Sequence, residues 1–419
     1  MFESLQFRHA TVKTTRHAFG VFRSFAIAKP RGGHLGRYWI ALAVILRVCP
    51  LPASENAAPG PFLPDLKSSV IRQYADVVYA TYHDAWAGAT NLQSCVQAFL
   101  HLPSKESMAR ARQAWVAARR PYLQSEVFRF YDGPIDEVEG WINAWPIDEA
   151  LIDYVIEDPS SGIINHPERY PGISCQLISD LNEKAGERSI TTGFHAIEFL
   201  LWGQDQRVDG PGDRSWKDYT TGTNAPRRAA YLRAAAELLV GHLRQVTDHW
   251  SPERPDNYRA GFLALPPDAA LGKILKGLGS LSGPELSGER LTVAYQTKEQ
   301  EDEHSCFSDT TDLDLRFDAL GIENVYLGRY RRVDGSLLTG PGIRKLVEEK
   351  DASLARLLDA QIGESFRAAA AIPPPFDQAI LGKDAAPGRV AINRAAKAFQ
   401  AQADTIAKAA AALGIAMNF

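Results

Sequence analysis

A histidine and a glutamate stand three residues apart in an otherwise apolar stretch of the chain. This stretch, residues 191–203, holds His195 and Glu198 among Phe, Ile, Leu and Trp side chains. The spacing puts both polar side chains on one helix face, and a helix that is apolar on most sides is buried. A buried carboxylate is costly unless it is paired, protonated or metal-bound. The pair therefore predicts either a metal site or a His–Glu hydrogen bond that joins two helices.

A second polar segment, residues 300–312, also contains a glutamate and a histidine that could bind a metal, but here the glutamate comes first. Glu301 and His304 have the Glu-x-x-His spacing that helical bundles use in carboxylate metal sites. The alternative is an acidic, solvated helix end followed by a capped turn. The two segments together predict a metal ion whose candidate ligands are His195, Glu198, Glu301 and His304.

Helices must position these side chains, because strict apolar–polar alternation over strand length is nearly absent. Apolar spacing, capping residues and alanine content predict long helices over residues 66–102, 105–124, 225–250, 353–372 and 389–413. The fold class predicted from the sequence is therefore all-α.

A Gly-, Pro- and Asn-rich stretch between residues 203 and 225 is the clearest break in composition. It predicts a division near residue 215 into two bundle-like halves, residues 59–215 and 216–419, with a cleft where ligand sites often form. Residues 1–58 are expected to be a leader and linker. They combine seven Lys or Arg and one acid before residue 38 with a nine-residue apolar core, which is typical of a secretory signal.

Composition excludes several classes of protein. The 419 residues carry 46 Lys and Arg against 50 Asp and Glu, a net charge of −4, so a basic nucleic-acid-binding face is not expected. No apolar run reaches the roughly 18–20 residues of a membrane span, and the mature chain is expected to have none. With its leader, the protein is expected in the periplasm or cell envelope.

Four segments, in order, resemble the imelysin family of bacterial envelope proteins. They are residues 126–133, 143–155, 193–205 with its GxHxxE signature, and 281–310. The resemblance spans about residues 65–415. It implies two similar four-helix bundles with a site at their interface near His195 and Glu198.

The resemblance also implies a function and further site residues. Iron is the metal that it implies, with a role in iron uptake or homeostasis and envelope iron-transport components as possible partners. The matching segments bring further candidate ligand-binding residues to the site: Glu126, Arg129, Trp145, Asp148, Glu149, Ser305 and Asp309.

Three functions stay open on the sequence. The first is an iron-handling envelope protein without enzymatic activity, and the second is a metal-dependent peptidase that uses the HxxE pair. The absence of HExxH, with Phe at residue 199, favours the first. The third is a structural envelope protein in which both motifs only pack. For a shared site, residues 301–309 must lie close to His195 and Glu198.

Overall fold

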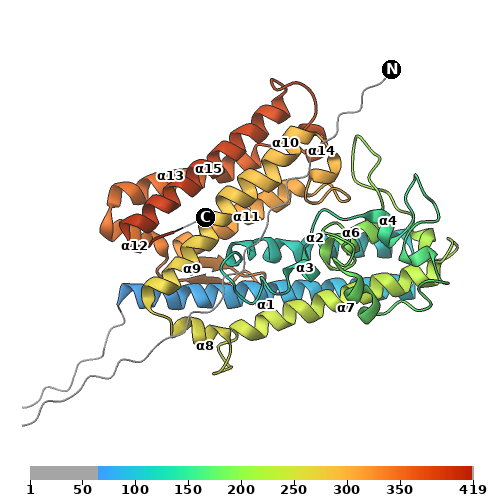
Figure 1. The fold of residues 1–419 in the computed structure, drawn as a ribbon, viewed down its shortest axis with the longest axis horizontal. Coiled ribbons are helices and arrows are strands. Elements are labelled where there is room, and N and C mark those ends of the chain that lie inside the picture. Colours follow the sequence, from blue (N-terminus) through green and yellow to red (C-terminus); the bar gives the residue numbers. More distant parts are fainter. Residues whose placement is uncertain (1–64, 418–419) are drawn as a thin grey trace, which may run out of the picture. The chain divides into compact units, whose positions relative to one another are not determined.

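Residues 65–417 are described by a computed structural model, and the predicted leader lies outside them. A first group of packed helices comprises α1 (Leu66–His101), α2 (Lys105–Leu123), α6 (Gly193–Trp202) and α7 (Ala225–Trp250). In Figure 1 the blue α1 and the yellow-green α7 lie side by side. Asp65 caps α1 by accepting from the Ser68 backbone N–H, and a capping box joins Ser104 and Ser107 at α2.

The second group of packed helices includes α15 (Pro387–Ala412). It contains α13 (Ala352–Ala370), α11 (Thr311–Leu327) and α9 (Pro267–Ser280), which continues directly into the π-helix η4 (Leu281–Val293). Figure 1 shows the orange and red members of this group running together. Helices α2 and α11 contact each other, so the two groups meet along that line.

Short elements connect these helices. The short helices are α3 (Glu139–Ile142), α4 (Glu149–Ile152), α5 (Cys175–Leu181), α8 (Tyr258–Leu263), α10 (Ala294–Thr297), α12 (Ile343–Lys350) and α14 (Phe376–Ala379). The 3₁₀ turns are η1 (Glu126–Phe128), η2 (Ile163–Asn165), η3 (Trp216–Tyr219) and η5 (Gln300–Asp302). Strands β1 (Arg329–Arg331) and β2 (Leu337–Thr339) form an antiparallel hairpin in which Tyr330 pairs with Leu338.

The predicted all-α class is confirmed, since the hairpin is the only sheet within residues 65–417. All five predicted long helices are present, with ends that differ from the predicted ones by at most two residues. Helix α7 packs along α1, although it follows the boundary expected near residue 215. That boundary stays a prediction, and the packing groups α7 with helices that precede it.

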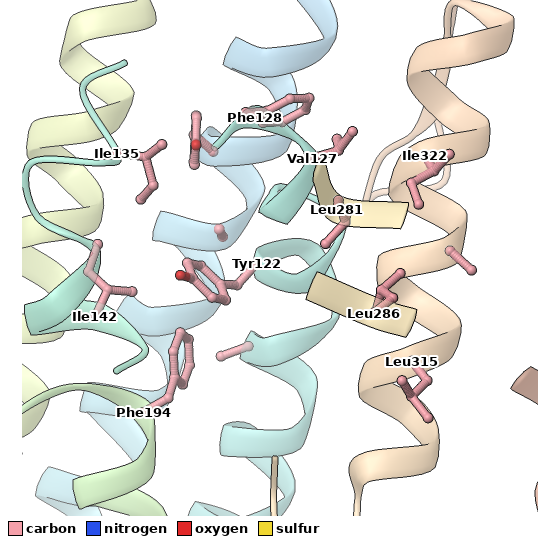
Figure 2. Packing of buried hydrophobic residues seen from close by; sticks show 14 of the residues in the cluster. Tyr122, Val127, Phe128, Ile135, Ile142, Phe194, Leu281, Leu286, Leu315 and Ile322 are labelled. Carbon is pink, nitrogen blue, oxygen red and sulfur yellow. The ribbon is translucent and has the colours of Figure 1, made fainter. Parts of the chain in front are cut away.

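Apolar side chains fill the space on both sides of α2. Figure 2 shows Phe194 of α6 next to Tyr122 at the end of α2, and the two ring centroids are 5.1 Å apart. On the other side, Leu281 and Leu286 of η4 face α11, which carries Leu315 and Ile322. The polar side chains described next are buried as well.

None of the helices between residues 65 and 417 combines the length and the apolar character that a membrane crossing demands.

Candidate functional site

Helix α6 places His195 and Glu198 in the interior. All ten of its residues are buried, and His195 Nδ1 lies 2.9 Å from Glu198 Oε2. Gly193 begins the helix with φ at +82°, and a Cβ there would lie 2.5 Å from the Ile142 carbonyl oxygen. Glycine is therefore required at this position of the motif, because it allows α6 to start in contact with the end of α3.

The second polar segment meets this pair directly. His304 Nε2 lies 3.3 Å from His195 Nε2, and the two ring centroids are 4.7 Å apart. Ser308 donates its backbone N–H and its hydroxyl to Glu198 Oε1, at 2.9 and 2.6 Å. The expected proximity of the two segments is confirmed.

A buried charged group fixes the far side of the His304 ring. Arg119 of α2 donates to Asp314 Oδ2 at 2.7 Å and to Asn143 Oδ1 at 2.6 Å. The same Asp314 oxygen lies 2.7 Å from His304 Nδ1 and accepts from Ser305 Oγ at 2.6 Å. These contacts from α2, α3 and α11 hold the imidazole in one orientation.

Helix η4 adds a second guanidinium. Arg290 contacts His304 Nδ1 and donates to Glu126 Oε2 at 3.0 Å and to Glu285 Oε1 at 3.0 Å. Arg129 also donates to Glu126, at 2.9 Å. Carboxylates thus neutralise the arginines in the interior, where an unpaired charge would be costly.

Burial sets the protonation of the central residues. It lowers the pKa of His195 well below its ordinary value, and the neighbouring His304 and Arg119 lower it further. Burial and the two adjacent guanidiniums likewise lower the pKa of His304. Burial raises the pKa of Glu198 to about 8, against the opposing hydrogen bonds from Ser308. Both imidazoles are therefore neutral at pH 7, which leaves a nitrogen lone pair on each ring.

The structure does not place every predicted site residue next to His195 and His304. Glu301 is directed to the surface, where its side chain is 58% exposed and pairs with Arg188. Asp148 is exposed at the start of α4. Glu149 and Asp309 are half-buried outside the direct contacts of the histidine pair, and burial raises the pKa of each to about 7.

The other predicted ligand-binding residues do lie around His304. The Trp145 ring meets the His304 ring edge-on, with centroids 5.6 Å apart. Ser305 donates its hydroxyl to Asp314, which in turn contacts His304. Glu126 and Arg129 form the outer part of the charged group through Arg290. Their proposed role as ligands stays a prediction.

Sequence reasoning missed five residues with direct contacts in the site. They come from α2, the end of α3, η4, the polar segment 300–312 and α11: Arg119, Asn143, Arg290, Ser308 and Asp314. A charged residue on the apolar face of a helix was the available signal, since Arg119 follows Trp115 by one turn. Asp314 gives the same signal beside Leu315.

The donor set suits a metal ion in part. Two nitrogen ligands about 2.1 Å from one ion lie roughly 3 Å apart, close to the 3.3 Å between the two Nε2 atoms. Imidazole and carboxylate are ligands that iron accepts. Within residues 65–417, however, no three His, Cys, Asp or Glu side chains already converge as a metal-binding group. The third donor, Glu198, is bonded to His195 instead.

An all-helical protein with a buried GxHxxE pair is the class that this fold and site define. The family model described as Imelysin, Peptidase M75, matches residues 78–406. The chain belongs to the imelysin family.

Similar proteins agree with this assignment. The chain is 27% identical over 351 residues to the "Iron-regulated protein A" of Synechococcus elongatus, a match that covers 81% of this chain and 85% of that protein. Two crystal structures share the fold. A candidate iron-regulated protein A precursor from Parabacteroides distasonis has a TM-score of 0.66 at 20% identity, over 87% of this chain and 98% of that one. An imelysin-like protein from Psychrobacter arcticum has a TM-score of 0.60 at 14% identity, over 84% and 97%.

Proposed function

We propose that this imelysin-family protein binds iron through Nε2 of His195 and of His304, with Glu198 holding the His195 ring at Nδ1, and that it serves iron uptake or homeostasis in the cell envelope. The observation that carries the proposal is the pair of facing imidazole nitrogens, 3.3 Å apart, from segments 109 residues apart in the chain. Two neutral imidazoles that face each other can share one hydrogen, or both can donate their lone pairs to an ion.

The protonation of the site supports this proposal. Metal binding requires neutral histidine and ionised carboxylate, and burial keeps both imidazoles neutral. Glu198 has a pKa of about 8, so its carboxylate is poorly stabilised in the protein alone. A cation bound at Nε2 of His195 would favour the ionised form of Glu198 across the same ring.

The charged residues around His304 support a positioning role. Asp314 contacts His304 Nδ1, which directs Nε2 of the same ring toward His195. Glu198 on His195 Nδ1 gives the arrangement of carboxylate, histidine and ion that is common in protein metal sites. Arg119 and Arg290 would oppose a cation on their own, but Asp314 and Glu126 pair with them.

The choice of iron as the ion and the location in the cell envelope are supported by different observations. Similarity to a protein named for its regulation by iron favours iron as the ion. The basic leader and its apolar core favour export, and envelope iron-transport components are the partners that such a role implies. No specific contact supports the peptidase alternative. Residue 199 is Phe, whereas an inverted zincin motif has histidine at this position.

Calorimetric titration with Fe²⁺ under anaerobic conditions tests the proposal. We expect one ion per chain for the metal-free wild type, and loss of tight binding in His195→Ala, His304→Ala and Glu198→Ala. The matched control is Glu301→Ala, which removes a predicted ligand that the structure places on the surface. Unchanged binding in both histidine variants, or loss of binding in the control, would contradict the proposal.

A further inference from the structure

A basic pocket of about 710 Å³ lies away from the histidine pair, between α2, α11 and the β1–β2 hairpin. Its volume is within the range of small-molecule sites. The polar side chains that line it include four arginines and two amides: Arg120, Arg329, Arg331, Arg332, Gln124 and Asn324. No aspartate or glutamate lines this pocket.

Two of these arginines are available to a ligand. Arg329 pairs with Glu323 at 3.0 Å, and Arg332 pairs with Asp84. Within residues 65–417, no ion pair engages Arg120 or Arg331. Arg331 donates only to the Gly335 carbonyl, at 3.1 Å. Guanidinium groups bind carboxylates and phosphates in a two-pronged geometry, so the pocket suits an anion.

The rest of the pocket wall is apolar. Phe317 and Leu320 contribute from α11, and Val333 and Leu337 contribute from the hairpin. The last two are 67% and 52% exposed, so they are accessible to an alkyl chain. Arg120 lies over the Phe317 ring at 5.9 Å, so the cationic and apolar parts adjoin.

Hydrogen bonds to α1 fix the hairpin, which forms one side of the pocket. Tyr330 donates its hydroxyl to the buried Asp84 at 3.1 Å, and Arg332 and the Val333 backbone bind the same carboxylate. A ligand would therefore meet a largely preformed surface, which lowers the entropic cost of binding.

We propose that this pocket binds an amphipathic organic anion: a carboxylate or phosphate head group at Arg120 and Arg331, with an alkyl chain along Phe317, Leu320, Val333 and Leu337. The proposal does not rest on metal binding, because the pocket shares no residue with the histidine pair. The absence of acidic lining residues distinguishes it from the pocket of about 810 Å³ beside α7, where Asp132, Asp248 and Asp256 accompany Arg244 and Arg254.

Calorimetric titration of the full chain with three probes, each below its micelle concentration where it has one, tests this proposal. Dodecyl phosphate has both parts of the ligand, inorganic phosphate has only the head group, and dodecyl maltoside has the chain on a neutral head. We expect saturable one-to-one binding of dodecyl phosphate and at least roughly tenfold weaker binding of the other two. Equal affinity for either partial probe would overturn the proposal.

Variants locate the binding. Arg120→Ala with Arg331→Ala should weaken dodecyl phosphate binding at least roughly tenfold, because charge-assisted hydrogen bonds are lost. Both side chains are exposed, so the fold should remain, and an unchanged urea denaturation curve verifies this. The matched control is Arg233→Ala, on an exposed face of α7 outside the pocket. Unchanged binding in the double variant, or an equal loss in the control, would contradict the assignment.

Discussion

At the scale of single residues, Arg119 links the segments that form the site. It is buried, and it pairs with Asp314, which in turn contacts His304. Removing one partner of a buried ion pair leaves the other charge without compensation. We expect Arg119→Ala to lower the free energy of unfolding by about 3–5 kcal/mol in urea denaturation of the metal-free protein.

Arg188→Ala is the control for Arg119→Ala. Arg188 is also paired, with Glu301, but both side chains are more than half exposed. The control should therefore change the free energy of unfolding by less than about 0.5 kcal/mol. Similar changes in the free energy of unfolding for the two variants would mean that the charged group around Asp314 contributes no more to stability than a surface ion pair does.

Asp309 makes stability depend on pH. Burial, with Asp205 and Asp377 nearby, raises its pKa from an ordinary 3.8 to about 7. Its native state thus keeps a proton that the unfolded state releases, and this stabilising effect is lost as the pH rises from about 4 to 7. Asparagine cannot ionise, and it tolerates the backbone φ of +54° at this position.

We therefore expect the stability of Asp309→Asn, relative to wild type, to rise between pH 4 and pH 7. The expected gain is on the order of 1 kcal/mol, because Asp309 is only partly buried and solvent screens the effect. Urea denaturation at both pH values measures it. A difference that stays constant over this range would show that Asp309 has an ordinary pKa.

Sequence predicted the central pair but not its surroundings. His195 and Glu198 could be found because their local neighbours are apolar, which predicts burial. Glu301 lies in an acidic run and is exposed, and spacing alone could not show on which side of the turn it points. The contact between Arg119 and His304 joins residues 185 positions apart, and only tertiary packing defines it.

At the scale of elements, Gly193 determines how α6 enters the core. A Cβ at this position would meet the Ile142 carbonyl oxygen at 2.5 Å, and φ is +82°. Gly193→Ala should therefore lower the free energy of unfolding by roughly 1–3 kcal/mol, through backbone strain and a steric clash. Thermal or urea denaturation measures the change, and Fe²⁺ titration should show weaker binding because His195 is displaced.

The same substitution within α7 is the matched control. Gly241 is exposed, and a Cβ there would meet no atom within 4 Å. Gly241→Ala should stabilise the protein by about 0.5–1 kcal/mol, since alanine is the better helix former. If Gly193→Ala proved equally harmless, the close approach of α6 to α3 would be wrong.

Helix positions were predictable where capping and apolar spacing act locally. Asp65 and Ser104 begin helices α1 and α2 through their own side chains. The π-helical geometry of η4 was not predictable, since nothing local distinguishes its hydrogen-bond pattern from that of an α-helix. This element supplies Arg290 to the site.

At the scale of the whole molecule, the all-α class follows from helical spacing along the chain, whereas the grouping of helices does not. The packing of α7 along α1 depends on complementary faces that lie more than a hundred residues apart. A break in composition near residue 215 marks a surface loop in this region, and such loops also occur within a bundle.

The leader gives a prediction about the location of the protein. A basic segment followed by a short apolar core predicts export and cleavage within a few residues of Ala53. Amino-terminal sequencing of the protein from the envelope fraction should start there. Recovery of the chain from the cytoplasm with Met1 intact would contradict this.

Anomalous diffraction at the iron edge, from crystals soaked with Fe²⁺ under anaerobic conditions, tests the proposed metal site most directly. We expect one anomalous peak about 2 Å from Nε2 of both His195 and His304. The absence of a peak within bonding distance of either histidine would contradict iron binding at this pair.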